Sequence, residues 1–145
     1  MIHRGTLHPG VSRDKVKLLG TGLWNDDAAI SREASLQGSW YAAPAPNADA
    51  EFVSKYHLTY GAAPAQLASL AYDAVSLVAL LASGTPYHRF TTSALMDPNG
   101  FAGVNGIFRF KSDGTSERGL AVLEVTATGP MVVSPAPTTF LGKNS

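Results

Sequence analysis

A single long apolar stretch, residues 67–82 (LASLAYDAVSLVALLA), constrains the fold more than any other part of the chain. Its polar residues Ser69, Asp73 and Ser76 recur at i, i+4 and i+7, so on a helix they form one narrow stripe and leave the remainder apolar. At about 1.5 Å per residue this helix spans about 24 Å, which is short of the ~30 Å hydrocarbon core of a bilayer. The pattern therefore predicts the inner helix of an α/β layer, buried on almost every side, rather than a membrane span.

The composition indicates one globular core and argues against several classes of function. The chain has 145 residues, 45% of them hydrophobic, and its 11 basic residues balance its 11 acidic residues. A chain without net charge offers no general field to a nucleic-acid backbone or an anionic membrane, so we expect neither partner. There is no cysteine, and the four histidines form no pair at i,i+3 or i,i+4. We therefore expect no metal site and no cofactor.

Turn-forming residues divide the chain into strands and helices. Pro44 and Pro46 stop the second expected strand, and Gly61 ends the helix that precedes the central one. Asp113-Gly114 is typical of a hairpin loop. We expect strands at residues 16–19, 36–43, 104–110, 120–126 and 131–133, with 104–110 and 120–126 paired as a hairpin. We expect helices at residues 48–60, 67–82 and 90–96, and a short one after Asn25 toward Glu33, which makes an α/β chain with an antiparallel end.

Several short motifs occur in an order that is similar to that of a known family. They are residues 18–25 (LLGTGLWN), residues 38–46, Tyr60-Gly61 before Pro64, residues 70–74 (LAYDA) and residues 100–110. Together they resemble the C-terminal part of type 1 periplasmic binding proteins of the leucine-binding kind, especially the branch known as penicillin-binding protein activators. The resemblance covers residues 11–140.

The resemblance implies a partial type 1 periplasmic-binding fold, with Rossmann-like lobes, that ends in an antiparallel hairpin. Family members are more than twice as long and join their two lobes by three crossings, one of which corresponds to Pro44 to Pro46 here. We expect residues 1–15 to be a disordered lead-in, 16–140 to be the C-terminal segment of the two-lobe domain, and 141–145 to be a tail. Strands that lack neighbours expose sheet edges, so we expect the isolated chain to form homo-oligomers.

Four residues are candidate ligand contacts by this resemblance: Thr21 and Gly22 in the turn after the first strand, Trp24 just beyond it, and Tyr72 in the central helix. In amino-acid binders of the family this turn often carries an acidic residue for the ligand ammonium, and Gly22 takes that place here. Trp24 either stacks on a ligand or packs against the protein. Tyr72 either faces the ligand cleft or is a core tyrosine whose hydroxyl has one partner.

The sequence gives no support to catalysis. Gly20 and Gly22 start a dinucleotide fingerprint, but Asn25 stands where the third glycine belongs. The chain has no G-x-S-x-G motif, and no serine, histidine and acidic residue can be grouped by spacing. We therefore expect a binding protein and not an enzyme.

Two functions remain open by the resemblance. The first is recognition of a small polar or amino-acid-like ligand in an interlobe cleft, as in extracellular solute receptors. The second is an envelope protein-interaction module that regulates a peptidoglycan synthase. Gly22 favours the second function, whereas a cleft-facing Tyr72 together with Trp24 favours the first. Either function places the protein in the periplasm or the envelope, although residues 1–15 lack the apolar run of a secretory signal.

Overall fold

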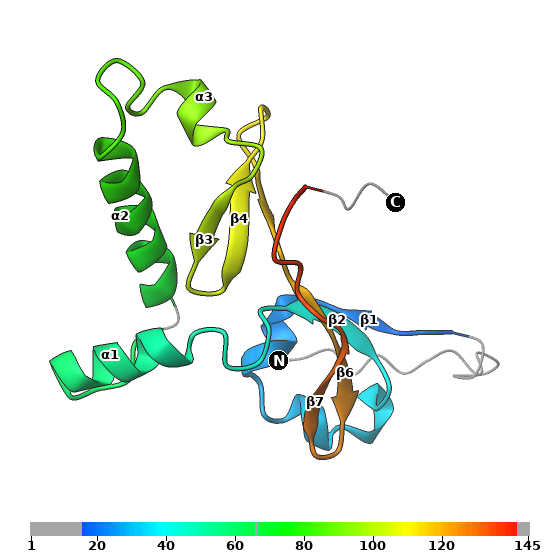
Figure 1. The fold of residues 1–145 in the computed structure, drawn as a ribbon. Helices are drawn as coiled ribbons and strands as arrows, with labels where there is room; N and C mark the ends of the chain where they lie inside the picture. The colour runs from blue at the N-terminus through cyan, green and yellow to red at the C-terminus, as the bar shows by residue number, and fades with distance from the viewer. Residues whose placement is uncertain (1–15, 66, 142–145) are drawn as a thin grey trace. The chain divides into compact units, whose positions relative to one another are not determined.

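The computed structural model describes residues 16–65 and 67–141, which form two compact units of mixed α/β structure (Figure 1). In this part of the chain, unit 1 contains residues 16–43 and 121–135, and unit 2 contains residues 44–120 and 136–141. The first passage from one unit to the other falls at Ala43 and Pro44, where proline interrupts strand pairing. The expected lead-in at residues 1–15 and most of the expected tail lie outside the described residues.

Unit 1 is built on a four-stranded mixed sheet in the order β1-β2-β6-β7. Strand β1 (Leu19–Gly20) runs parallel to β2 (Trp40–Ala43), and β2 pairs antiparallel with β6 (Ala121–Thr126). Strand β6 in turn forms an antiparallel hairpin with β7 (Gly129–Ser134). The described chain therefore ends its regular structure in an antiparallel hairpin, as the predicted fold class has it, but this hairpin joins β6 to β7 and not 104–110 to 120–126.

Three short 3-10 helices connect β1 to β2 where the sequence predicted one helix toward Glu33. They are η1 (Gly22–Asp26), η2 (Ile30–Arg32) and η3 (Ala34–Leu36). The Asp27 carboxylate accepts a hydrogen bond from Ala29 N at 2.8 Å, and the Glu33 carboxylate accepts from Ser35 N at 3.3 Å. Such local side-chain bonds compete with a continuous helical ladder, so the segment breaks into single turns.

The core of unit 1 is formed by side chains of β2 and β6. Tyr41 of β2 stands opposite Leu123 of β6 in the ladder, and both side chains are buried. Along β6 buried and half-buried residues alternate, which is the period of a strand with one face on a core. On the half-buried face Trp40 Nε1 donates to Glu124 Oε2 at 2.8 Å. The strands predicted at 36–43 and 120–126 are thus confirmed at shorter bounds.

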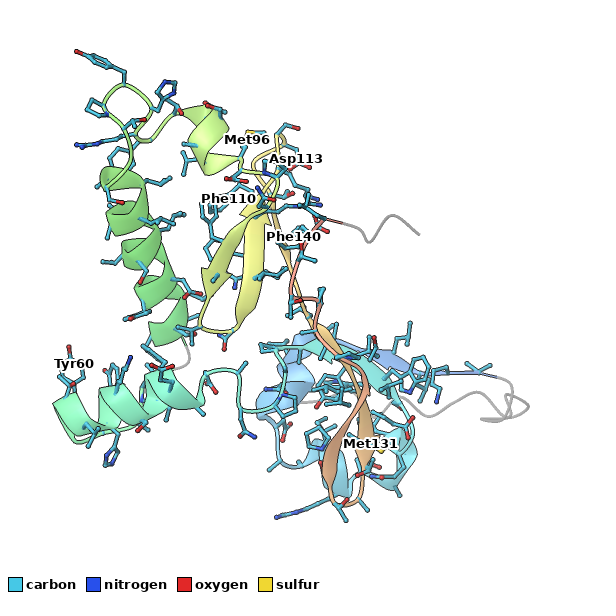
Figure 2. The ribbon with its side chains drawn as sticks, viewed as in Figure 1. Tyr60, Met96, Phe110, Asp113, Met131 and Phe140 are labelled. Carbon is cyan, nitrogen blue, oxygen red and sulfur yellow. The ribbon has the colours of Figure 1, made fainter. Side chains whose placement is uncertain are left out.

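Unit 2 combines helices with a three-stranded antiparallel sheet in the order β3-β4-β5. Its small core centres on Phe108, which is 4% exposed and lies 5.7 Å from Phe101 and 5.9 Å from Phe110, ring centre to ring centre. Figure 2 adds the side chains and labels Phe110 and Phe140 of this unit. The elements are α1 (Ala50–Tyr60), α2 (Ala68–Ala82), α3 (Thr92–Leu95), β3 (Phe101–Gly103), β4 (Gly106–Phe110) and β5 (Ser116–Arg118).

The hairpin around Asp113-Gly114 forms, but its predicted second strand is wrong. Strand β4 pairs with β5, where Arg109 stands opposite Glu117 and the two side chains form an ion pair at 2.8 Å. Residues 121–126 belong instead to the sheet of unit 1, between β2 and β7. The turn at Asp113-Gly114 brings Ser116–Arg118 directly back onto β4, so β6 pairs with β2 and β7 instead.

The central helix forms at α2, but the prediction that it is buried on almost every side is wrong. Asp73 Oδ1 accepts a hydrogen bond from Val104 N at 2.8 Å, and Asn105 Nδ2 donates to Ser69 Oγ at 3.0 Å. The polar stripe therefore faces the turn between β3 and β4, because that turn offers N–H donors that the stripe can accept. The buried residues of α2 are Ser69, Asp73 and Leu77, whereas Leu70, Val75, Val78 and Leu80 are exposed. Self-association through such exposed residues stays a prediction.

Candidate functional site

The turn after β1 presents Thr21 and Gly22, two of the four predicted ligand contacts. The Thr21 carbonyl oxygen accepts from Trp24 N at 3.1 Å, which opens η1, and both turn residues are exposed. A Cβ placed on Gly22 would lie 3.2 Å from the Ala42 carbonyl oxygen. The turn therefore runs close to the backbone of β2, and a larger residue at position 22 would have to displace it.

Trp24, the third predicted contact, folds back over Gly20. A Cβ at Gly20 would overlap the six-membered ring of Trp24, so the tryptophan packs directly on the glycine backbone. The Trp24 ring centre lies 6.0 Å from that of Tyr41, tilted by 57°. Trp24 also lines a cavity of about 430 Å³ within unit 1, together with Ile30, Val125 and Pro130. Packing and cavity lining therefore coexist at this one side chain.

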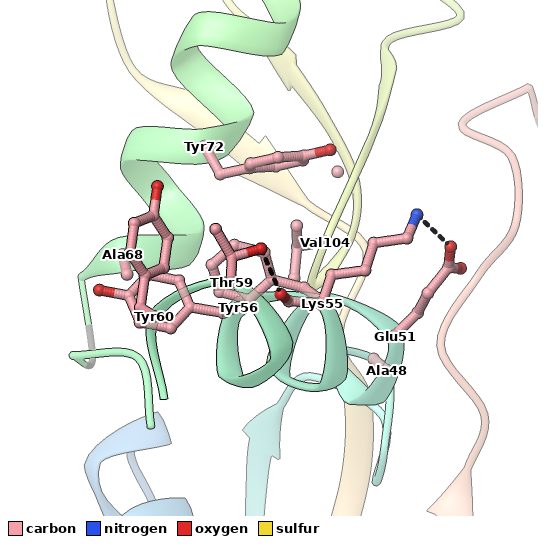
Figure 3. Close-up of a pocket in the computed structure, with 11 residues that line it drawn as sticks. Ala48, Glu51, Lys55, Tyr56, Thr59, Tyr60, Ala68, Tyr72 and Val104 are labelled. Carbon is pink, nitrogen blue, oxygen red and sulfur yellow. Dashed lines mark hydrogen bonds and ion pairs between the residues drawn. The ribbon is translucent and has the colours of Figure 1, made fainter. Parts of the chain in front are cut away.

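Tyr72 lies in unit 2, in a pocket of about 500 Å³ formed by α1, α2 and the turn between β3 and β4 (Figure 3). The residue is 52% exposed, and its ring centre lies 5.2 Å from that of Phe52. A side chain with this exposure forms a pocket wall rather than part of a core. The lining residues are Ala48, Glu51, Phe52, Lys55, Tyr56, Thr59, Tyr60, Ala68, Tyr72, Gly103 and Val104.

Three further aromatic side chains of this pocket come from α1. Phe52, Tyr56 and Tyr60 recur every four residues, so they lie on one face of the helix. Ring centres are 5.9 Å apart for Phe52 and Tyr56, and 4.6 Å apart for Tyr56 and Tyr60. The spacing of these residues in the sequence puts them on one helix face, but we did not predict them as site residues from the sequence. The spacing of the three aromatic residues was the only sequence signal for this site. In the structure α1 has no buried residue, so its aromatic face is free to line a pocket.

Lys55 and Glu51 add charge to the same pocket. Lys55 Nζ lies 2.6 Å from Glu51 Oε1, and both side chains are largely exposed. The hydrogen bond and the charge of Lys55 lower the pKa of Glu51, and those of Glu51 raise the pKa of Lys55. Both groups are therefore charged at neutral pH. Figure 3 shows the pair reaching past α1 on the same side as Tyr72.

Asp73 holds the opposite wall of the pocket in place. Its Oδ1 accepts from Val104 N, and its Oδ2 is buried without a hydrogen-bond partner in the described structure. A Cβ at Gly103 would lie 2.6 Å from that second oxygen, so only glycine lets β3 approach the carboxylate. Asp73 thus positions Gly103 and Val104, both of which line the pocket.

The four predicted contacts divide between the two units: Thr21, Gly22 and Trp24 belong to unit 1, and Tyr72 belongs to unit 2. The pocket at Tyr72 offers ring faces, hydroxyls, an ammonium and a carboxylate, which are groups for binding a small organic molecule. In the described residues no three His, Cys, Asp or Glu side chains gather as metal ligands. None of the described helices is long and apolar enough to cross a membrane.

Comparison with known proteins places the fold. No family model matches the chain, and no curated protein matches it. A protein from Rhodospirillum rubrum assigned as a branched-chain amino acid ABC transporter is 26% identical, with a TM-score of 0.64. An extracellular ligand binding receptor from Desulfohalobium retbaense is 27% identical, with a TM-score of 0.51. Each likeness covers 82% of this chain, but only 37% and 22%, respectively, of the other chain.

A third solved structure adds support for the fold alone. It is an ABC transporter substrate-binding protein from Desulfitobacterium hafniense, 22% identical with a TM-score of 0.52, and it covers 82% of this chain and 36% of that one. The Desulfitobacterium protein is a substrate-binding protein and the Desulfohalobium protein is a ligand binding receptor, and none of the three is described as a penicillin-binding protein activator. The chain spans little more than a third of the length of the Rhodospirillum rubrum protein. In its described residues it has a partial type 1 periplasmic-binding fold.

Proposed function

We propose that this chain takes part in the non-catalytic binding of a small polar or amino-acid-like ligand, as part of a solute receptor of the periplasm or envelope. The likeness at 26% identity to a protein assigned to branched-chain amino acid transport supports this ligand class. Because the chain spans only 37% of that protein, the function of a whole receptor is part of the proposal.

The pocket at Tyr72 is the observation that carries the proposal. It combines four aromatic side chains with an exposed ammonium and carboxylate in a volume of about 500 Å³. Small-molecule sites are mostly apolar cavities of about 300–1,000 Å³ with a few convergent polar groups. We further propose Thr21, Gly22 and Trp24 as ligand contacts on unit 1, supported by the exposure of the turn and the cavity beside Trp24.

The affinity of this chain for free amino acids is expected to be low. By the resemblance to type 1 periplasmic binding proteins, Gly22 takes the place of the residue that is often acidic in amino-acid binders and pairs with the ligand ammonium. A ligand ammonium that finds no acidic partner on unit 1 loses about 2 kcal/mol of binding free energy there, or ~30-fold in affinity. Leucine, isoleucine and valine are therefore expected not to reach micromolar affinity.

The proposal is tested by titrating the isotope-labelled chain with L-amino acids up to about 10 mM, an upper range for weak binding. We expect saturable shifts of backbone amide signals at Gly103 and Val104 for at least one amino acid. The variant Tyr72→Leu should weaken that binding, whereas Val133→Ala, on the exposed strand β7, should leave it unchanged. Unchanged spectra with every amino acid would refute the proposed function.

The alternative function, an envelope module that regulates a peptidoglycan synthase, stays a prediction. None of the solved structures described above is named for such a role.

A further inference from the structure

The pocket between α1 and α2 has a floor of aromatic rings drawn from two helices. Phe52 is its centre, with ring contacts to Tyr56 on α1 and to Tyr72 on α2. These rings are tilted against their neighbours by 52° and 56°, not stacked flat. A further ring can join such a cluster edge to face, which is a favoured geometry for aromatic pairs. Side chains on this floor therefore favour a planar aromatic group over a branched aliphatic one.

The aromatic floor is open rather than filled by the protein. Tyr60 is 68% exposed and Tyr72 is 52% exposed, and Phe52 and Tyr56 are only half-buried. In Figure 3 Tyr72 extends from α2 across α1, while Tyr56 and Tyr60 lie on the α1 side of the same space. A ligand ring would thus contact side chains already held together by one another, which limits the conformational entropy lost on binding.

Lys55 and Glu51 supply two opposite charges beside this floor. Their ion pair is exposed to solvent, and water screens such a pair so that it contributes little to stability. Little is therefore lost when a ligand separates the two side chains. Lys55 offers N–H donors to a carboxylate, and Glu51 offers two acceptor oxygens to an ammonium.

We propose that this pocket takes an α-amino acid with an aromatic side chain, a ligand class that rests on the proposed function and makes it specific. The ring lies on Phe52, Tyr56 and Tyr72, the carboxylate pairs with Lys55, and the ammonium pairs with Glu51. An aromatic acid without an amine leaves Glu51 beside a second carboxylate. An aromatic amine without a carboxylate places its charge beside Lys55. Only the zwitterion matches both groups.

The first test compares four probes on the full 145-residue chain: L-phenylalanine, 3-phenylpropanoate, 2-phenylethylamine and L-leucine. Dissociation constants come from amide shifts of the labelled chain. We expect L-phenylalanine to bind most tightly, and each of the other three to bind about fivefold to tenfold more weakly, which corresponds to one lost charged or aromatic contact. Leucine binding as tightly as phenylalanine would overturn the aromatic assignment and leave the proposed function standing.

The second test separates the two charges. Lys55→Met should weaken phenylalanine binding about fivefold or more, but it should not weaken 2-phenylethylamine, which lacks the carboxylate. Glu51→Gln should weaken phenylalanine binding as well, but it should not weaken the binding of 3-phenylpropanoate, which lacks the ammonium. Lys111→Met is the matched control, since this lysine lies outside the pocket in the turn after β4. Equal phenylalanine affinity in the Lys55 and control variants would overturn the proposal, whereas no binding by any amino acid would refute the proposed function as well.

Discussion

Strand β6 and helix α2 are both rich in apolar residues, yet they bury opposite kinds of side chain. Along β6 the buried residues are Ala121, Leu123 and Val125, and the more polar positions between them are only half-buried. Along α2 two of the three buried residues are Ser69 and Asp73. The strand therefore buries the residues that its own pattern selects, whereas the helix buries those that its neighbours can hydrogen-bond.

The difference teaches that apolar content alone does not orient an element. Strand β6 lies between two other strands, so its ladder is complete and its apolar face meets Tyr41 and Ala43 of β2. Helix α2 meets the turn between β3 and β4, whose Val104 N–H and Asn105 amide require acceptors. A donor left without a partner costs about 1–3 kcal/mol, which is as large as the gain from burying one further valine side chain, so hydrogen bonds of the turn decide which face of α2 is covered.

The largest expected effect is loss of packing in β6. Leu123 is fully buried, so Leu123→Ala should lower the free energy of unfolding by about 2–5 kcal/mol through lost burial and a residual cavity. Val132→Ala is the control, because Val132 stands opposite Leu123 in β7 but is 45% exposed. Urea denaturation measures both variants. Similar small losses in the two would mean that β6 is not the core of unit 1.

The next effect tests whether the polar stripe of α2, and not its apolar side, is the buried side. Asp73→Ala removes the acceptor of Val104 N and should cost about 1–3 kcal/mol, the penalty of leaving this half-buried donor unpaired. Val75→Ala should cost less than about 0.5 kcal/mol, because Val75 is 70% exposed. Thermal unfolding compares them directly. A greater loss for Val75→Ala would restore the sequence-based view that the apolar sides of α2 are buried.

The contact between Trp24 and Gly20 gives an effect of similar or smaller size in unit 1. Gly20→Ala should cost about 1–3 kcal/mol, because the added methyl overlaps the Trp24 ring. In a Trp24→Ala background the same change should cost much less, since the overlapping ring is gone. Denaturation of the four proteins forms a double-mutant cycle. Additive effects would show that Trp24 does not pack on Gly20.

The smallest expected effect concerns the exposed pair Glu51 and Lys55. Lys55 lowers the pKa of Glu51, so the pair stabilises α1 above the ordinary pKa of a glutamate, and this stabilisation is lost as pH falls through the lowered pKa. In Lys55→Met the pKa of Glu51 should return toward its ordinary value, as followed by NMR titration of the carboxyl. The lowered pKa of Asp113, caused by Thr115, should not change. If the pKa of Glu51 were the same in Lys55→Met as in the parent chain, the result would contradict the ion pair.

The sequence by itself predicted the elements whose signals are local. Helix α2 ends within one residue of the prediction at each end, and α1 ends at Tyr60 before Gly61, whose left-handed backbone suits glycine. The turn at Asp113-Gly114 also formed where its chemistry indicated, with Thr115 N donating to Asp113 Oδ1 at 2.9 Å. These features depend on neighbours a few residues away, so spacing and turn residues suffice to find them.

Only the tertiary structure decided which surfaces meet. The partner of β4, the buried face of α2 and the joining of Phe52 with Tyr72 each depend on residues at least six positions apart in the chain. For Tyr72 the sequence left a core role and a ligand-facing role open, and the exposed pocket of α1 and α2 removed the first. Hydrophobic periodicity shows which side of an element is apolar. Burial also depends on the surface that packs against that side, and the sequence of the element does not specify that second surface.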